Sequence, residues 1–426
     1  MFPATPGIPQ GIIDLVIDQA QSDSATLQAL SLVSKASSVR TRGYLFHDIE
    51  LSAEYECYTL ESLLDERPSL RQCIKSLTIR VITFSNWLNK NPSEAILAVL
   101  PLLDSLTRFS IFGKFGPSRS LEWKRLLPRV QIALCEVMAR PHVTSITLSF
   151  ISGFDIGLLT RYGHLEELVL DVVKPGSRKP GPRNPAKHGA LFPLNASPSS
   201  PSSIPVRARL RRLHVTTSPR AFRALLPCSE NSEATLDLSK LTHLKVNTSN
   251  EGSEFNDADW NCLFDVCGAS IESYTVHQRA CQKPVPPAVI PLYRFPNLKE
   301  FILMIDFQTI EQHGHNSFPV FVEALDRLSQ ADNENHLTTI RVEYDGCAKF
   351  IEREVNELLA GQRWRWLDEI VQRPAFLRLR EVKFGFTLRC CRGIFWETNW
   401  GEHSGRISSQ LSNLDQRGIL TLTRTL

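Results

Sequence analysis

The sequence predicts an α/β fold in which short parallel strands alternate with helices, behind a short head that is entirely helical. Three observations lead to this prediction: a six-residue apolar pattern that keeps returning, helical stretches between its occurrences, and an N-terminal stretch that lacks the pattern. The chain has 426 residues, of which 42% are hydrophobic and 22% are charged. This composition is typical of a globular protein with enough apolar residues for a large core.

The returning pattern reads apolar, two variable residues, apolar, one variable residue, apolar. Its eleven occurrences are 46–51, 74–79, 106–111, 143–148, 165–170, 210–215, 241–246, 271–276, 298–303, 337–342 and 379–384. The second half of the pattern alternates with period two, which indicates a strand with one buried face. Helical stretches are expected between the strands, at 93–103, 123–139, 221–226, 260–267, 318–328 and 350–359.

Strand and helix units at intervals of 22 to 45 residues resemble leucine-rich repeats. One unit cannot bury its apolar strand face alone, so neighbouring units stack and share a continuous core. We therefore expect residues 46–389 to form an irregular leucine-rich-repeat-like solenoid, with parallel strands on a concave face and helices on the convex side. Regular repeats have an Asn two residues beyond the pattern, and none of the eleven units has it. The alternative is a bent α/β sheet of another kind.

Residues 1–45 are expected to form a module of three short helices. The apolar run from Ile12 to Ile17 is long enough for about two helical turns. Ser24 is the expected N-cap of a second helix over 25–34, and a third segment covers 39–46. About forty residues cannot bury this much apolar surface, so the module is expected to dock on another surface.

The head resembles the F-box-like module found at the N-terminus of many fungal proteins. The matching features are Ile8-Pro9, Ile12-Ile13-x-Leu15, the Leu30–Lys35 segment LSLVSK and the exit at Leu45-Phe46. This resemblance implies that the head binds a Skp-type adaptor, which joins the protein to a cullin ubiquitin ligase as a non-catalytic substrate receptor. The residues implied in adaptor binding are Ile8, Pro9, Ile12, Ile13, Leu15, Val16, Leu30, Leu32 and Val33.

Two positions differ from the family pattern and support a second hypothesis. The family usually has an acidic residue where this chain has Gln10-Gly11, and a Trp where it has Ala36-Ser37. The second hypothesis is a repeat-protein interaction scaffold that no longer binds the adaptor, with the head acting as a cap. The third hypothesis is a hydrolase or transferase on an α/β fold. The sequence contains no nucleophile elbow, no phosphate-binding loop and no dinucleotide fingerprint, so it gives this hypothesis no support.

The target of such a receptor is expected to bind the variable positions of the strands, which face the concave side. For the later repeats the candidate target-binding residues are Arg212, His214, His243, Lys245, Asn247, His277, Arg341, Glu343 and Lys383, and Thr216, Glu300 and Glu381 share this face. Both charge signs occur, which favours a protein ligand over a nucleic acid, for which a consistently basic stripe is expected. The target itself is unknown from the sequence.

Residues 174–205 interrupt the repeats with prolines, glycines, serines and basic residues. Between Lys174 and Arg212 there are nine Lys or Arg and no acid, so the remainder of the chain has a net charge of −6. Such a segment cannot offset its ordering entropy, and we expect a disordered insert. Within it, Ser197 and Ser200 precede prolines and are candidate phosphorylation sites. Residues 390–426 are expected to cap the last repeat, with Trp396 and Trp400 over apolar edges and one more strand at 419–422.

The sequence shows no sign of a cofactor site, a metal site, a disulfide framework or a membrane-spanning segment. No cofactor or metal is expected, because His313 and His315 have no partner at ligand spacing and the ten cysteines form no paired framework. The cysteines are expected to be reduced thiols. No signal peptide or membrane-spanning segment is recognised, so a cytoplasmic or nuclear location is expected.

Overall fold

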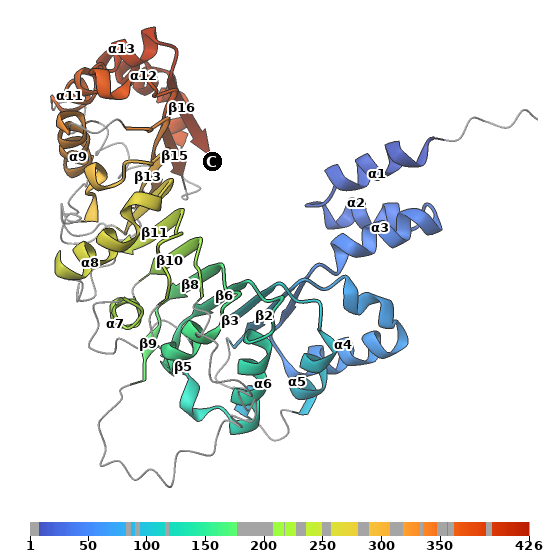
Figure 1. Cartoon of the computed structure of the whole chain (residues 1–426). Helices are drawn as coiled ribbons and strands as arrows, with labels where there is room; N and C mark the ends of the chain where they lie inside the picture. Colours follow the sequence, from blue (N-terminus) through green and yellow to red (C-terminus); the bar gives the residue numbers. More distant parts are fainter. Residues whose placement is uncertain are drawn as a thin grey trace, which may run out of the picture. The chain divides into compact units, whose positions relative to one another are not determined.

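The structure is a computed structural model, and two compact units emerge from it. It describes residues 8–81, 87–89, 94–115, 119–176, 208–216, 218–226, 236–248, 257–279, 289–306, 318–331, 335–346, 356, 362–388 and 394–425. Unit 1 comprises residues 1–155 and 172–206, and unit 2 comprises residues 156–171 and 207–426. Figure 1 labels the helices and strands of both units.

The head of unit 1 consists of the three expected helices, α1 (Gln10–Gln19), α2 (Ser24–Ser31) and α3 (Lys35–Leu45). The N-cap of α2 is Asp23, whose Oδ1 accepts hydrogen bonds from the N–H groups of Ala25 and Thr26, each at 3.1 Å. The expectation of Ser24 as the cap was therefore wrong, because the carboxylate one residue earlier reaches both orphan N–H groups. The helix also ends at Ser31, before the predicted end at Ser34.

The third head helix begins earlier than the sequence indicated. Ser34 is its N-cap and accepts from the Ser37 N–H at 3.1 Å, so α3 starts at Lys35 and not at Val39. The polar run after Ser34 hid this start, because it offers no apolar periodicity to mark a helix.

Unit 1 continues with four parallel strands, in the order β1-β2-β3-β6. Their bounds are β1 Asp48–Leu51, β2 Ser76–Arg80, β3 Arg108–Phe112 and β6 Ser145–Ser149. Each coincides with one occurrence of the apolar pattern, and the patterns pair in register, as in Ile79 with Ile111. Helices α4 (Glu54–Glu66), α5 (Glu94–Val99) and α6 (Pro128–Met138) lie along one face of these strands. Of these, α4 was not predicted.

A second, small sheet follows the C-terminal ends of these strands. It contains β4 (Lys114–Phe115), β5 (Arg119–Glu122), β7 (Ile151–Phe154) and β9 (Lys174–Pro175). The first two residues of the predicted insert are therefore a strand, which corrects that part of the disorder prediction. Residues 177–205, with Ser197 and Ser200, lie outside the described residues.

Unit 2 contains eight parallel strands, in the order β8-β10-β11-β12-β13-β14-β15-β16. Their bounds are β8 Glu167–Asp171, β10 Arg212–Thr216, β11 His243–Thr248, β12 Ser273–Arg279, β13 Glu300–Asp306, β14 Thr339–Gly346, β15 Glu381–Leu388 and β16 Leu420–Thr425. The helices are α7 Pro219–Arg223, α8 Asp257–Cys267, α9 Phe318–Gln330, α11 Arg363–Ile370, α12 Ile394–Gln410 and α13 Ser412–Gln416. Figure 1 shows α8, α9 and α11 along one side of the strands.

Short 3-10 helices complete the connections. They are η1 Pro68–Gln72, η2 Trp87–Asn89, η3 Leu100–Leu102, η4 Trp123–Arg125, η5 Ile156–Arg161, η6 Gly268–Ser270, η8 Leu292–Arg294 and η9 Pro374–Phe376.

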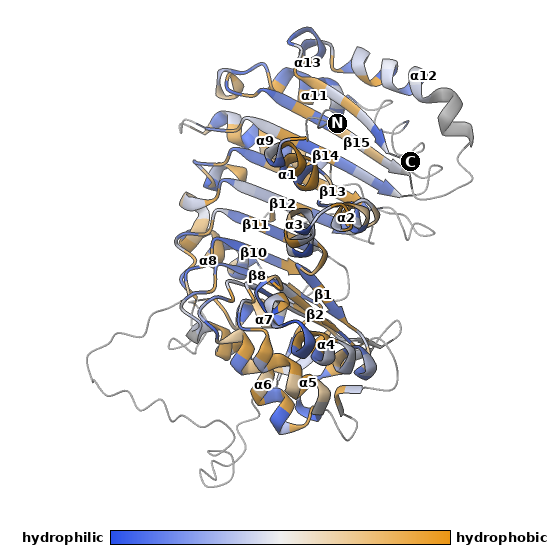
Figure 2. Cartoon of the chain, turned by 90° about the vertical axis from the view of Figure 1, so that its right-hand side faces the viewer, coloured by the Kyte–Doolittle hydropathy of each residue, from blue (hydrophilic) through white to orange (hydrophobic). Residues whose placement is uncertain are grey.

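The apolar pattern forms the core under the strands. From Ile74 onward, all three apolar positions of every occurrence are at most 3% exposed. Figure 2 shows apolar and polar residues alternating along strands such as β12 to β15. All eleven predicted strands are confirmed, and so is the additional strand near the end of the chain, which is β16. The leucine-rich-repeat-like arrangement of parallel strands with helices on one side is thus the observed fold.

Near the end of the repeats the observed helix differs from the predicted one. The predicted helix at 350–359 lies, apart from Asn356, outside the described residues, and α11 at Arg363–Ile370 was not predicted. The expected role of Trp400 agrees with its ring, which packs edge-on against Phe386 at 5.4 Å between centroids. The domain boundaries after residues 45 and 389 stay predictions.

Candidate functional site: the helical head and the open sheet face

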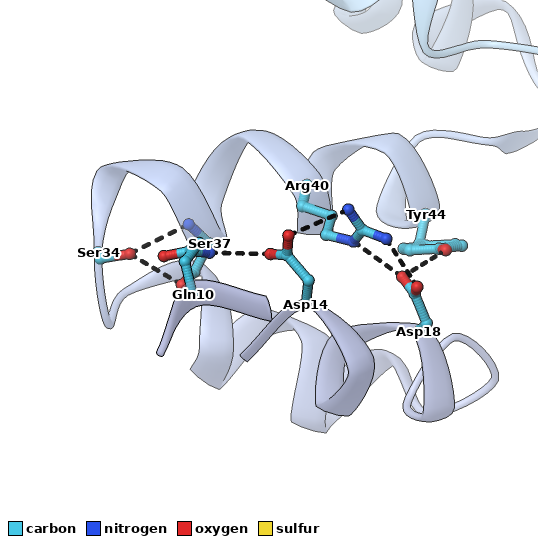
Figure 3. A network of polar contacts seen from close by, with 7 residues as sticks. All are labelled: Gln10, Asp14, Asp18, Ser34, Ser37, Arg40 and Tyr44. Carbon is cyan, nitrogen blue, oxygen red and sulfur yellow. Dashed lines mark hydrogen bonds and ion pairs between the residues drawn. The ribbon is translucent and has the colours of Figure 1, made fainter. Parts of the chain in front are cut away.

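The head helices are joined by a network of polar side chains (Figure 3). Arg40 on α3 donates from Nε to Asp18 Oδ1 at 2.8 Å and from Nη2 to Asp18 Oδ2 at 2.6 Å, and its Nη1 lies 3.4 Å from Asp14 Oδ2. Tyr44 donates its hydroxyl hydrogen to Asp18 Oδ1 at 2.8 Å, and Gln10 Nε2 donates to Asp14 Oδ1 at 2.8 Å. Helix α1 is therefore fixed to α3 by one arginine shared between two carboxylates.

This network shifts the ionisation of its members. Hydrogen bonds from Arg40 and Tyr44 lower the pKa of Asp18, and the bond to Asp18 raises the pKa of Arg40. The hydrogen bond to Asp18 is also the main reason why the pKa of Tyr44 is raised. At neutral pH Asp18 is therefore ionised, Arg40 is positively charged and Tyr44 is neutral.

Because polar groups and only a few buried side chains hold the head together, most of its apolar side chains face solvent. Ile17 and Leu27 are buried at 0% and 2% exposure. The exposed apolar side chains of the head are Ile8 (67%), Ile12 (52%), Leu15 (63%), Val16 (49%), Leu32 (87%), Val33 (65%) and Val39 (64%). Single exposed apolar residues are ordinary, but seven within this short head, on α1 and α3 and in the segments before α1 and after α2, offer apolar area that a partner can bury. Figure 2 shows the apolar character of α1.

The sequence-predicted adaptor residues lie on this head, with different exposure. Six of them belong to the exposed apolar set, and Pro9 at the N-cap of α1 is exposed as well. Ile13 and Leu30 are half-buried. Val39, the seventh exposed apolar side chain, is not among the residues predicted from the sequence.

The second candidate surface is the face of the unit 2 strands opposite the helices, which we call the open face. Along each strand the apolar pattern points to the helices. Most of the intervening residues are half-buried or exposed, whereas Thr216 and Asn247 are buried. The target-binding residues expected from the sequence occupy these intervening positions on β10, β11, β12, β14 and β15. The parallel register places them in rows across the strands, such as His214 opposite Lys245.

At β13 to β15 the charges of the open face neutralise one another. Arg341 Nη2 lies 3.6 Å from Glu300 Oε1 and 3.9 Å from Glu381 Oε2, and Lys383 Nζ lies 3.8 Å from Glu343 Oε1. Gly385 leaves room for the Glu343 carboxylate, because a Cβ atom at Gly385 would overlap it. The structure thus brings these residues into two groups of ion pairs, one around Arg341 and one around Lys383, in which both signs are paired.

At β10 to β12 the open face carries a different set of side chains. His214 Nε2 and Thr216 Oγ1 are 3.0 Å apart, and Asn247 Nδ2 and His277 Nδ1 are 3.1 Å apart. Burial lowers the pKa of His214 to about 4, and the neighbouring Lys245 and His277 contribute to the shift. His214 is therefore neutral at pH 7, and Lys245 carries the charge beside it.

The part of the chain that the structure describes contains neither a metal-site cluster nor a helix able to cross a membrane. No group of three or more His, Cys, Asp or Glu in these residues is arranged to hold a metal ion. None of the described helices is long and apolar enough to cross a membrane. Cys57, Cys73, Cys135 and Cys267 are in no disulfide, whereas Cys262 is disulfide-bonded, so the expectation of reduced thiols is wrong at that position. His313 and His315 lie outside the described residues.

Comparisons with known proteins return structural similarities only. No protein-family model matches the chain, and no curated protein matches it in sequence. Among solved structures, the chain is similar to the leucine-rich repeat-containing protein LegL7 from Legionella pneumophila, with 12% identity, a TM-score of 0.36 and coverage of 87% of this chain and 98% of that one. It is also similar to a chain of the Rad7 and Elc1 complex in yeast, with 13% identity, a TM-score of 0.35 and coverage of 99% and 94%.

Proposed function

We propose that this protein is a non-catalytic substrate receptor, in which the helical head binds a Skp-type adaptor of a cullin ubiquitin ligase and the open face binds a target protein. The observation that supports this most is the set of seven exposed apolar side chains on the head. They come from α1 and the residues before it, from the α2–α3 connection and from α3, and the polar network around Arg40 holds α1 and α3 in one arrangement.

Burial of this surface offers enough free energy for a specific complex. Transferring a Val, Leu or Ile side chain from water to an apolar contact contributes about 1.5–3 kcal/mol. On a preorganised head, the summed burial free energy of several such side chains exceeds the free-energy cost of fixing two molecules together. A receptor of this type needs no catalytic group of its own, because holding the target near the ligase raises its effective concentration.

The matched experiment compares two exposed leucines. Leu32→Asp changes a side chain of the head that is 87% exposed, and Leu377→Asp changes one at 77% exposure in unit 2. We expect the full chain to co-purify with a recombinant Skp-type adaptor, Leu32→Asp to weaken the complex at least tenfold, and Leu377→Asp to leave it unchanged. Pro9→Ala, at the N-cap of α1, is expected to weaken it as well.

The experiment also tests the second candidate function, a repeat scaffold without an adaptor. Gln10 favours this candidate, because its side chain bonds Asp14 within the head and supplies no acid, and Ala36 is exposed where the family has a Trp. If the wild-type chain stays alone while folded, the substrate-receptor proposal fails and the scaffold stands. If Leu32→Asp unfolds the whole chain, as judged by circular dichroism, the head is a structural cap.

A further inference from the structure

The open face of unit 2 has one region whose positive charge is not neutralised. On β13 to β15 the cations Arg341 and Lys383 each have carboxylates within 4.0 Å. On β10 to β12 the described open-face side chains include no acid. Arg212 and Lys245 are the cations, and His243, His277 and the neutral His214 lie beside them. We call this region the cationic patch. Among the described residues, no carboxylate forms an ion pair with Lys245.

Lys245 lies at the centre of the cationic patch. It pairs in register with His214 on β10 and with Thr275 on β12, and it is half-buried. The acids nearest in register are Glu167 and Asp171 on β8 and Glu300 on β13, each two strands away from β11. A half-buried ammonium group without a carboxylate partner is a site where an added anion is favoured, because the surrounding protein screens less than water does.

Asn247 adds a second requirement on the ligand. It is 6% exposed, and its amide is engaged with His277, yet its Oδ1 has no hydrogen-bond partner. A buried acceptor without a donor costs free energy until an N–H or O–H group reaches it. A polypeptide offers both groups at once, since an acidic side chain can pair with Lys245 while a backbone N–H donates to Asn247.

The strand next to the cationic patch is apolar on the same face. Ile302 and Met304 on β13 are half-buried, and they pair in register with Thr275 and His277 of β12. From β11 to β13 the sheet advances by two strand spacings, roughly 10 Å. An extended chain in the polyproline II conformation covers this distance in about three residues, at roughly 3.1 Å per residue, and its side chains three residues apart point to the same side.

From these relationships we propose that the open face across β10 to β13 binds an extended polypeptide segment through two anchors. An acidic side chain pairs with Lys245, and an apolar side chain about three residues away contacts Ile302 and Met304. This inference rests on the proposed function insofar as it treats the bound segment as part of the target protein. It specifies the chemistry of that target, an acidic residue spaced from an apolar one.

The test uses the full chain without adaptor and the fluorescein-labelled peptide Ser-Glu-Ser-Ser-Leu-Ser, followed by fluorescence anisotropy at low salt. Two control peptides replace its Glu by Gln or its Leu by Ser. We expect each control peptide to bind more weakly than the parent. Lys245→Gln is expected to reduce affinity for the parent peptide roughly tenfold. Lys240→Gln is the matched control, because Lys240 is exposed in the turn before β11 and lies outside the open face.

A second readout is the titration of His214 by NMR. Its pKa of about 4 reflects burial together with the positive charge of Lys245 and His277. A bound carboxylate offsets that charge, so the parent peptide should raise the pKa of His214 and the Gln peptide should not. This readout separates binding at the cationic patch from binding elsewhere on the chain.

The inference is overturned if the parent and Gln peptides bind equally, or if Lys245→Gln and Lys240→Gln behave alike. These results are independent of the adaptor experiment. Discrimination between the peptides without an adaptor complex would reject the proposed ligase role alone. A head-dependent adaptor complex without discrimination would reject the two-anchor site alone.

Discussion

Arg40 and Asp18 join α3 to α1 through two parallel hydrogen bonds, Nε to Oδ1 at 2.8 Å and Nη2 to Oδ2 at 2.6 Å. A bidentate pair of this kind fixes both distance and orientation, which a single apolar contact does not. The relationship explains how a head with few buried apolar side chains keeps its helices aligned. It also leaves the apolar side chains of α1 and of the α2–α3 connection free for a partner.

Replacing this arginine is expected to loosen the head and leave the repeats intact. Arg40→Met keeps much of the side-chain length but removes the charge and the donors, so Asp14 and Asp18 lose their common partner. Backbone amides of α1 should then exchange faster in hydrogen-exchange mass spectrometry, while those of β12 to β15 remain unchanged. Arg42→Met is the control, since no side-chain hydrogen bond or ion pair is found for Arg42 among the described residues. Equal exchange in both variants would contradict a specific role for Arg40.

Acid should release the same contact in a defined pH range. Because the pKa of folded Asp18 lies below its ordinary value of 3.8, the contact contributes stability that is fully present above that value. This contribution is lost as the pH falls through the lowered pKa of the folded state. We therefore expect α1 exchange protection, after correction for intrinsic exchange rates, to hold from pH 7 down to about 5 and to weaken only below about 4. Asp18→Asn should remove this acid transition, and a loss of protection near pH 6 would disagree with it.

Asp368 is expected to hold the C-terminal helices to the repeats. Its side chain is buried at 4% exposure, and its Oδ2 and Oδ1 accept from the N–H groups of Asn413 and Leu414, each at 3.0 Å. Asp368→Ala leaves both N–H groups at the start of α13 without their acceptor, which should cost about 1–3 kcal/mol. Urea unfolding followed by circular dichroism measures this loss.

The matched control for this prediction is Asp415→Ala, because Asp415 is exposed on α13 itself. We expect it to change stability by less than about 0.5 kcal/mol. Equal losses for the two alanine variants would mean that α13 needs no anchor on α11.

Two glycines of unit 2 should respond differently to the same substitution. A Cβ at Gly385 meets the carboxylate end of Glu343, which can rotate away, whereas a Cβ at Gly268 lies 2.8 Å from the backbone oxygen of Arg294. We expect Gly268→Ala to destabilise the protein by about 1–3 kcal/mol and Gly385→Ala by less than about 1 kcal/mol. Thermal unfolding of both variants provides the comparison, and a larger loss for Gly385→Ala would contradict the side-chain explanation.

Gly385→Ala should nevertheless alter the open face. Rotation of Glu343 away from β15 separates it from Lys383, which now lies 3.8 Å away. The salt dependence of target or peptide binding is therefore expected to increase, because a second cation becomes available on the open face. Unchanged salt dependence would mean that Glu343 and Lys383 remain paired in another rotamer.

The sequence by itself determined the repeating part of this protein. A strand with one buried face needs an apolar residue at every second position. The sequence of each unit contains such residues, for example Phe301 and Leu303. Stacking then repeats the same requirement from unit to unit, so pattern and register agree, as in Leu303 opposite Val342. The exposed apolar surface of the head also followed from counting apolar residues against its length.

The tertiary structure alone decided the contacts that depend on residues distant in sequence. The pairing of Arg40 with Asp18 and the capping of α13 by Asp368 join segments whose spacing carries no periodic signal. The same holds for the unneutralised charge of Lys245. Which charges find partners depends on how neighbouring strands align, and a single strand's sequence does not contain that information.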